Sequence, residues 1–246
     1  MAHYKLILAY DGTDFLGFQR QSEGRTVQAV LESALRNIGW NGSSISGAGR
    51  TDTGVHANGQ VVGFAFEWDH SPENLRDALN ANLPPDIAVR SAEVVGDDFH
   101  PRYSAVYRTY EYRLFFDSIR NPLKERYAWR IWPQFEIGLV EESAAKLSGI
   151  HDFSAFGTSP KPGGSTIRQI FRATWKIDKG ILVFEISGNA YLYHMVRRLV
   201  NYQVEVGHGT RSPDELENFL REEHAEMVQG LAPARGLFLK EVKYPV

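Results

Sequence analysis

The chain has 246 residues, 43% of them hydrophobic, which is enough to bury the core of one large domain or of two closely packed halves. It contains no cysteine, which excludes disulfides and thiolate zinc sites and fits a reducing cytoplasm. Its net charge of -3 does not favour binding to nucleic acid, because phosphate contacts need Lys and Arg.

The N-terminal part of the chain predicts strands alternating with helices. Residues 5–10, 60–66 and 87–95 have the composition of strands. Thr26 and Ser71 each precede apolar residues spaced as on one helix face, and each is the expected N-cap. We expect no signal peptide and no membrane contact, because no cleavage site follows the first strand and no stretch approaches roughly 18 apolar residues.

The remainder of the chain continues in the same order. It predicts a strand over 107–116, a helix over 137–147, strands over 170–177 and 181–187, helices over 195–200 and from 212, and a strand over 237–242. We therefore expect an α+β protein in which two similar α/β halves share a mixed, largely antiparallel sheet with flanking helices. The predicted halves are 1–101 and 102–246.

A basic stretch interleaved with aromatic residues runs from Arg102 to Arg130. It holds seven Lys and Arg against three Asp and Glu, whereas acidic residues gather between 214 and 226. The mixture suits a nucleic acid, because cations bind the phosphate backbone and ring faces stack on bases. The alternative is that the aromatic side chains fill a core and the Arg side chains form its solvated face.

A glycine-rich loop from Gly47 to Ala57 holds Arg50, Asp52 and His56 between two strand-like segments. Glycines allow positive φ angles and the close approach of a ligand. A guanidinium near Asp52 favours the ionised carboxylate, which suits a nucleophile. The alternative is a surface turn in which Asp52 bonds its own backbone and Arg50 is a solvated partner.

Other catalytic and cofactor motifs are incomplete. The third glycine of a dinucleotide fingerprint is missing after residues 47–49, the P-loop lysine is missing from 163–166, and there is no His-Glu-x-x-His. We therefore expect no metal and no nucleotide cofactor. The tripeptide at 52–54 also occurs in aspartic proteases, but those enzymes need two such carboxylates and this chain has one.

The loop segment GRTDTGVHA at 49–57 is one of a series of motifs along the chain. The others are YDGT at 10–13, GFQRQ at 17–21, TVQ at 26–28, FHPR at 99–102, RTYEY at 108–112, YHMVR at 193–197, AP at 232–233 and GLFL at 236–239. In this order the series resembles TruA-type tRNA pseudouridine synthases from residue 4 to residue 245. Phe18 departs from the tryptophan common in that family, and Asn201 from a usual glycine.

The resemblance implies the pseudouridine synthase fold and an enzyme that isomerises uridine to pseudouridine in tRNA without a cofactor. It implies that Asp52 is the catalytic nucleophile. Attack on the sugar, addition to the base and removal of a ribose proton all remain open for this carboxylate. Tyr110 is expected to pack against the target base, Arg197 to pair with Asp52, and Leu237 to form an apolar wall.

The resemblance also implies contacts with RNA. Arg50 is expected to steady phosphate, and His56 to help hold the target nucleotide away from its stack. Arg108 shares a strand face with Tyr110, so we expect Arg108 at a phosphate. The expected targets are tRNA positions 38, 39 and 40 in the anticodon stem-loop, and the expected enzyme is a cytoplasmic homodimer. The alternative is an RNA-binding or chaperoning protein of this fold without turnover.

Overall fold

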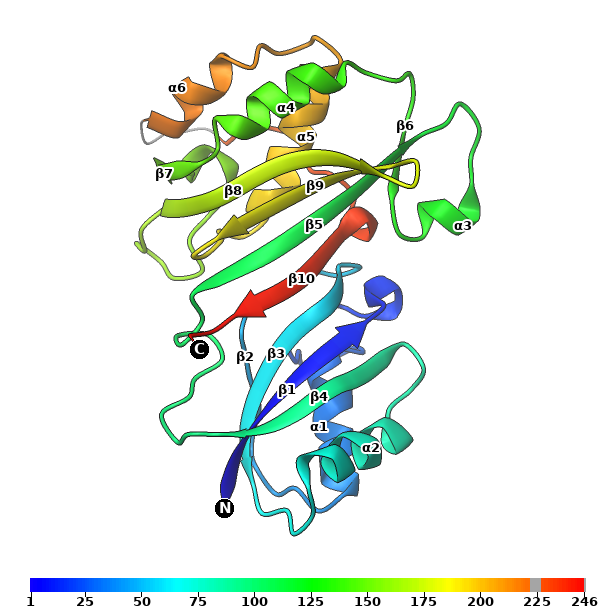
Figure 1. Cartoon of the computed structure of the whole chain (residues 1–246), viewed down its shortest axis with the longest axis vertical. Coiled ribbons are helices and arrows are strands. Elements are labelled where there is room, and N and C mark those ends of the chain that lie inside the picture. The colour runs from blue at the N-terminus through cyan, green and yellow to red at the C-terminus, as the bar shows by residue number, and fades with distance from the viewer. Residues whose placement is uncertain (222–226, 246) are drawn as a thin grey trace. The chain divides into compact units, whose positions relative to one another are not determined.

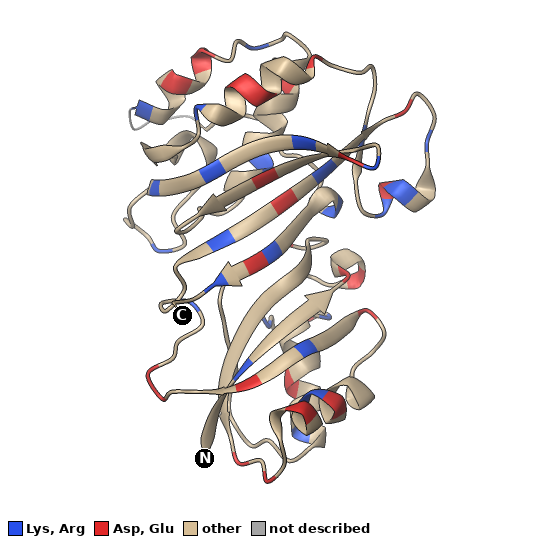
Figure 2. Ribbon diagram, viewed as in Figure 1, with Lys and Arg blue, Asp and Glu red and all other residues tan. Residues whose placement is uncertain are grey.

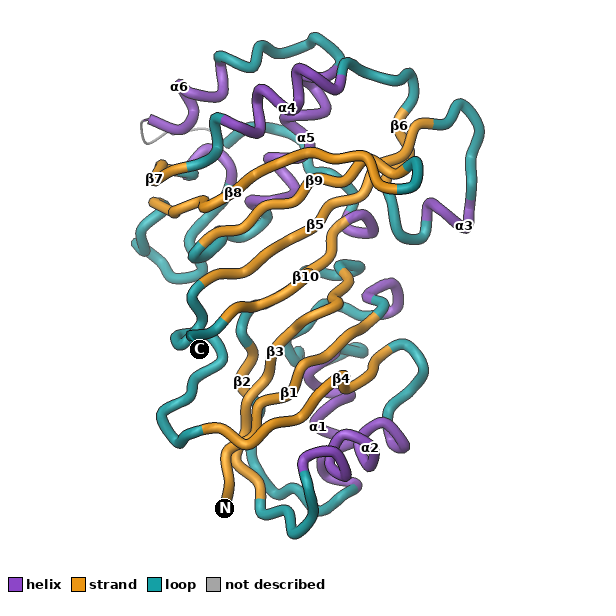
Figure 3. The backbone as a smooth tube through the Cα atoms, viewed as in Figure 1, coloured by secondary structure: helices purple, strands orange, loops and turns teal. Residues whose placement is uncertain are grey.

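A computed structural model of the chain describes residues 1–221 and 227–245. The chain forms two compact units, one from Met1–Val106 with the chain from Phe238 onward, the other from Tyr107–Leu237. In each unit a sheet is flanked by helices (Figures 1 and 3). The predicted α+β class is confirmed.

The sheet of the first unit combines antiparallel and parallel pairing. Its strands follow the order β4 (Ile87–Val95), β1 (Ala2–Tyr10), β3 (His56–Phe66) and β10 (Leu237–Lys243), and β2 (Ser46–Gly47) also pairs with β3. β1 is antiparallel to β3 and β4, whereas β10 runs parallel to β3, with Phe238 opposite His56. The last strand therefore brings the C-terminal segment beside the strand that follows the Asp52 loop.

The helices of the first unit are α1 (Val27–Asn37) and α2 (Pro72–Asn82). Both predicted caps are confirmed: the Thr26 hydroxyl accepts from the Ala29 N–H at 3.3 Å, and the Ser71 hydroxyl accepts from the Asn74 N–H at 3.3 Å. The helices lie on one face of the sheet (Figure 1). The alternate side chains of β1 are buried beneath them, as expected for a strand with one face on the core.

The sheet of the second unit has the order β5 (Tyr107–Phe116), β9 (Ile181–Gly188), β8 (Ile167–Asp178) and β7 (Gly149–Asp152), all antiparallel, with β6 (Trp129–Ile131) parallel to β5. Its helices are α3 (Pro122–Glu125), α4 (Ile137–Ala145), α5 (Met195–Gly207) and α6 (Glu215–Arg221). The Trp175 indole on β8 donates to Gln203 Oε1 on α5 at 2.7 Å. This buried bond attaches α5 to the sheet.

Charge is unevenly distributed over the second unit. Figure 2 shows mainly Lys and Arg on β5 and β8, and mainly Asp and Glu on α4 and α6. Residues 222–226 of the predicted acidic region lie outside the described residues. On β5 the aromatic side chains of Tyr110, Tyr112 and Phe115 are buried. These three aromatic residues therefore belong to the core, as the alternative interpretation of the basic, aromatic stretch expects. Tyr107 and Phe116 are half-buried, and Arg108, which that interpretation places on a solvated face, is buried.

Candidate active site

The loop between β2 and β3 presents Asp52 from a backbone that is held at several points in the first unit. The Thr51 hydroxyl lies 2.8 Å from the Tyr10 hydroxyl, and the Gln60 amide donates to Gly49 O at 2.9 Å. Burial raises the pKa of Tyr10 to about 12, against the smaller lowering effects of hydrogen bonds with Thr51 and Gln60. Tyr10 is thus a neutral anchor for Thr51, and Asp52 beside it is half-buried.

Glycines of the preceding segment let the chain pack directly on the backbone of this loop. Gly17 has a φ of 87°, and a Cβ there would lie 2.7 Å from Thr51 O and 3.3 Å from the carbonyl carbon of Asp52. A Cβ on Gly12 would lie 2.0 Å from Val55 O. A side chain at either position would displace the loop. The position of Asp52 therefore requires the glycines of the motifs at 10–13 and 17–21.

His56 is enclosed at the end of the loop, with 1% of its surface exposed and its ring stacked on Phe238 at 4.6 Å. Its Nδ1 lies 3.0 Å from Gly12 N and 3.1 Å from Asp11 Oδ1. The first contact needs a lone pair on Nδ1 and the second needs a proton. We favour the first, because the Gly12 N–H is a fixed donor and Asp11 Oδ1 already accepts from the Thr13 N–H and hydroxyl.

The predicted residues of the loop therefore differ in their access to a ligand. Arg50 is exposed, Asp52 is half-buried and His56 is buried. The observed contacts of the His56 ring hold the loop in place, and its contact with RNA stays a prediction. An exposed guanidinium and a partly accessible carboxylate are the groups that this loop can offer directly to a substrate.

In the second unit, β5 carries Arg108 and Tyr110 two residues apart, on one strand face. The Tyr110 ring meets the edge of Tyr191 at 4.9 Å, and the Tyr191 hydroxyl donates to Arg108 O at 3.1 Å. The Arg108 guanidinium donates to Asn189 O at 2.8 Å, and 8% of the residue is exposed. Tyr110 is therefore held by packing, and the phosphate contact of Arg108 stays a prediction.

Arg197 lies in the first turn of α5, where its Nε donates to Ala232 O at 2.7 Å. Burial raises the pKa of Tyr112 on β5, and the positive charges of Arg197 and Arg235 oppose that rise. Arg197 and the β5 face that carries the tyrosines thus come together within the second unit. The predicted pairing of Arg197 with Asp52 joins residues of different units and stays a prediction.

Leu237, the predicted apolar wall, begins β10 and is buried. Sequence reasoning assigned no role to Tyr10 or Tyr191, whose hydroxyls hold Thr51 and the backbone of Arg108. The sequence did single out Tyr10, because it is the first residue of the motif at 10–13. No short-range pattern distinguished Tyr191 from the other aromatic residues of the chain.

Across residues 1–221 and 227–245, His, Asp and Glu side chains do not gather in groups of three or more that could hold a metal ion. In the same ranges no helix has the length and apolar character needed to cross a membrane.

The chain is an α+β protein in which a glycine-rich loop presents one half-buried carboxylate, Asp52. A family model described as tRNA pseudouridine synthase matches residues 6–104 and 143–245. tRNA pseudouridine synthase A of Streptococcus equi subsp. equi (strain 4047) is 41% identical over 250 residues, 99% of each chain. Its counterpart in Lacticaseibacillus casei (strain BL23) is 39% identical over 99% of this chain and 100% of its own. The chain belongs to the tRNA pseudouridine synthase family, which isomerises uridine in tRNA.

The family model covers Asp52, Arg197 and Leu237, whereas Arg108 and Tyr110 fall between its two matched segments. The full-length relatives span those two residues as well. Among solved structures, a Cbf5-Nop10-Gar1 complex aligns at 10% identity and a TM-score of 0.35, covering 82% of this chain and 44% of that one. We draw no conclusion about this chain from a structural similarity at that level.

Proposed function

We propose that Asp52 is the catalytic carboxylate with which this enzyme isomerises uridine to pseudouridine in tRNA. The observation that carries the proposal is the half-buried Asp52 on a backbone fixed by Tyr10 and packed against Gly17. Such rigidity suits a reacting group, because catalysis depends on geometry held to within about 0.5 Å.

The reaction needs a carboxylate beside the glycosidic bond. The bond from uracil N1 to ribose C1′ breaks, the base turns, and a bond from C5 to C1′ forms. C5 loses a proton and N1 gains one, so no atom is added overall and no cofactor is consumed. Asp52 could serve by attacking the sugar, by adding to the base or by removing a ribose proton, and each route uses the carboxylate.

The target base must leave its stack, which costs a few kcal/mol, and an aromatic face offsets part of that cost. In this proposal Tyr110 packs against the uracil, and its own position is supported by the edge of Tyr191. Leu237 supplies an apolar wall. Arg197, oriented by Ala232 O, is the charge partner of Asp52.

The RNA contacts and the target belong to the same proposal. Arg50 binds phosphate from the exposed side of the loop, and Arg108 and His56 assist in holding the RNA. The target uridines are positions 38, 39 and 40 of the anticodon stem-loop. The enzyme acts as a cytoplasmic homodimer on its tRNA partner. Mapping of the modified positions and sedimentation of the purified protein test these two statements separately.

The central experiment incubates purified protein with unmodified tRNA, without added metal or nucleotide, and maps pseudouridine. Asp52→Asn should form no product while tRNA affinity changes little, because an amide of similar size cannot act as a nucleophile. Asp14→Asn, at an exposed aspartate of the neighbouring segment, is the matched control and should keep full turnover. Near-normal turnover of Asp52→Asn would remove Asp52 from the mechanism.

A further inference from the structure

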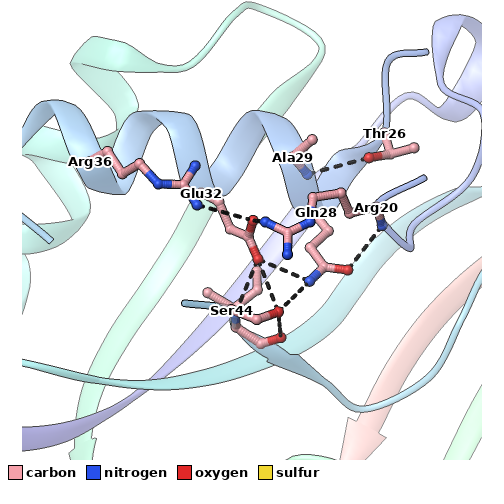
Figure 4. A network of polar contacts seen from close by, with 8 residues as sticks. Arg20, Thr26, Gln28, Ala29, Glu32, Arg36 and Ser44 are labelled. Atoms are coloured by element: carbon pink, nitrogen blue, oxygen red, sulfur yellow. Dashed lines mark hydrogen bonds and ion pairs between the residues drawn. The ribbon is translucent and has the colours of Figure 1, made fainter. Parts of the chain in front are cut away.

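Glu32, on α1 of the first unit, is a fully buried carboxylate that the proposed reaction does not use. Figure 4 shows it at the centre of a polar network. Its oxygens accept from Arg20 Nη1 at 2.6 Å, Gln28 Nε2 at 2.9 Å, Ser44 Oγ at 3.2 Å and Ile45 N at 3.2 Å, and Arg36 Nη2 lies 3.5 Å away. A buried charge with such partners rarely stabilises a fold more than apolar packing would. The stability of the fold alone therefore does not explain why a buried carboxylate is present at position 32.

The first connection from Glu32 to the catalytic loop runs through the segment that contains Gly17. Gln28, bound to Glu32, accepts from Arg20 N at 3.0 Å with its Oε1. The backbone N–H of Gln28 donates to Phe18 O at 2.9 Å, and Phe18 N donates to Thr51 O at 3.0 Å. This series of bonds links Glu32 to the residue that precedes Asp52.

The second connection runs through the segment that enters the loop. Ile45, whose N–H donates to Glu32, is followed directly by β2, which pairs with β3 and continues into the loop. The Phe18 ring packs on Gly47 of β2 so closely that a Cβ there would lie 2.5 Å from the ring. The two connections thus meet at Phe18 and Gly47, ahead of Asp52.

The polarity of the network requires an acceptor at position 32. The guanidinium of Arg20, the amide of Gln28 and the N–H of Ile45 all point hydrogens at Glu32. An ionised carboxylate accepts every one of these bonds. An amide in its place would turn an NH2 group toward donors and would shift Arg20, Gln28 or Ile45.

We propose that Glu32 is a positioning residue for Asp52, acting through the 17–20 segment and the 45–47 segment. The inference rests on the proposed role of Asp52. Displacement of a reacting group by about 1 Å costs on the order of 10²-fold in rate, so modest shifts of either segment affect turnover. In this proposal the network around Glu32 fixes the position of the Asp52 carboxylate, and Glu32 itself does not contact the substrate.

The test is Glu32→Gln in the full chain, with initial rates of pseudouridine formation measured across tRNA concentration and corrected for the folded fraction. We expect kcat to fall about 10-fold to 100-fold with KM changed less than about twofold, since the shift acts on the reacting group. Leu35→Ala is the matched control, because Leu35 is fully buried in the same helix outside the network. It should lower the melting temperature and keep kcat.

Ser44→Ala removes one bond to Glu32 with little risk to folding, and should lower kcat by a smaller factor in the same direction. An increase in KM with kcat unchanged, or equal kcat for Glu32→Gln, Ser44→Ala and wild type, would overturn the proposal. Asp52→Asn in the same assay separates the two hypotheses. If that variant turns over, the role of Asp52 fails, whereas an inactive Asp52→Asn beside a fully active Glu32→Gln refutes the positioning role alone.

Discussion

A single methyl group at Gly17 tests the packing of the Asp52 loop. The φ of Gly17 is 87°, and its Cβ would lie 2.7 Å from Thr51 O. Gly39, also in the first unit, has a φ of 97° and no atom within 4 Å of its Cβ position. Gly17→Ala therefore adds backbone strain and a collision with the loop, whereas Gly39→Ala adds backbone strain alone.

The expected magnitudes follow from these two terms. A left-handed backbone costs an L-residue about 1 to 2 kcal/mol, and the stiffer unfolded chain of an alanine variant returns about 0.4 to 1 kcal/mol. Overpacking adds about 1 to 3 kcal/mol. We expect the free energy of unfolding to fall by about 1 kcal/mol for Gly39→Ala and by about 2 to 4 kcal/mol for Gly17→Ala. The difference measures the contact with Thr51.

The assay combines urea unfolding with initial rates of pseudouridine formation at saturating tRNA. Relief of the collision must move Thr51 and Asp52 by a few tenths of an ångström, so we expect kcat of Gly17→Ala to fall about tenfold while Gly39→Ala stays active. Equal stability and activity in the two variants would refute close packing of Gly17 on the loop. Equal loss of activity in both would show that the fall in kcat does not come from the contact of Gly17 with Thr51.

Three further predictions address the remaining residues. Arg197→Ala should lower turnover more than tRNA affinity, because Asp52 loses its charge partner, and a change in affinity alone would make Arg197 a phosphate contact. Arg108→Ala should flatten the slope of log tRNA affinity against log salt by about 0.9, and a flatter slope only for Arg113→Ala would put the RNA on the other strand face. Burial raises the pKa of Tyr10 from its usual 10.0 to about 12, so folded Tyr10 keeps a proton that the unfolded chain releases above pH 10.0. The stabilisation that this provides is complete below that pH and is lost as the pH rises to about 12. Measured by urea unfolding, the free energy of unfolding of Tyr10→Phe should therefore fall by about 2 to 3 kcal/mol less than that of wild type between these pH values. The same fall in both proteins would contradict the raised pKa of Tyr10.

Local features of the fold could be predicted from the sequence because their causes lie within a few residues. Thr26 and Ser71 cap helices through N–H groups three positions on, and the alternation of β1 follows from its own side chains. β2, β6, β7 and α3 escaped prediction, because segments of two to four residues carry too little pattern. The Asp52 loop and the family were recognisable because the motifs stand in order along the chain.

The tertiary structure alone decided which polar groups are buried. Glu32 lies between Gln28 and Arg36 on the polar side of α1, and the approach of Arg20, Ser44 and Ile45 from other segments makes its burial tolerable. His56, a polar residue in a glycine-rich loop, is enclosed against Phe238, and the sequence pattern did not predict that burial. The stacking depends on parallel pairing of β10 with β3, between segments far apart in the sequence. Pairing of that range is decided by the free energy of the whole core, which no short window of sequence contains.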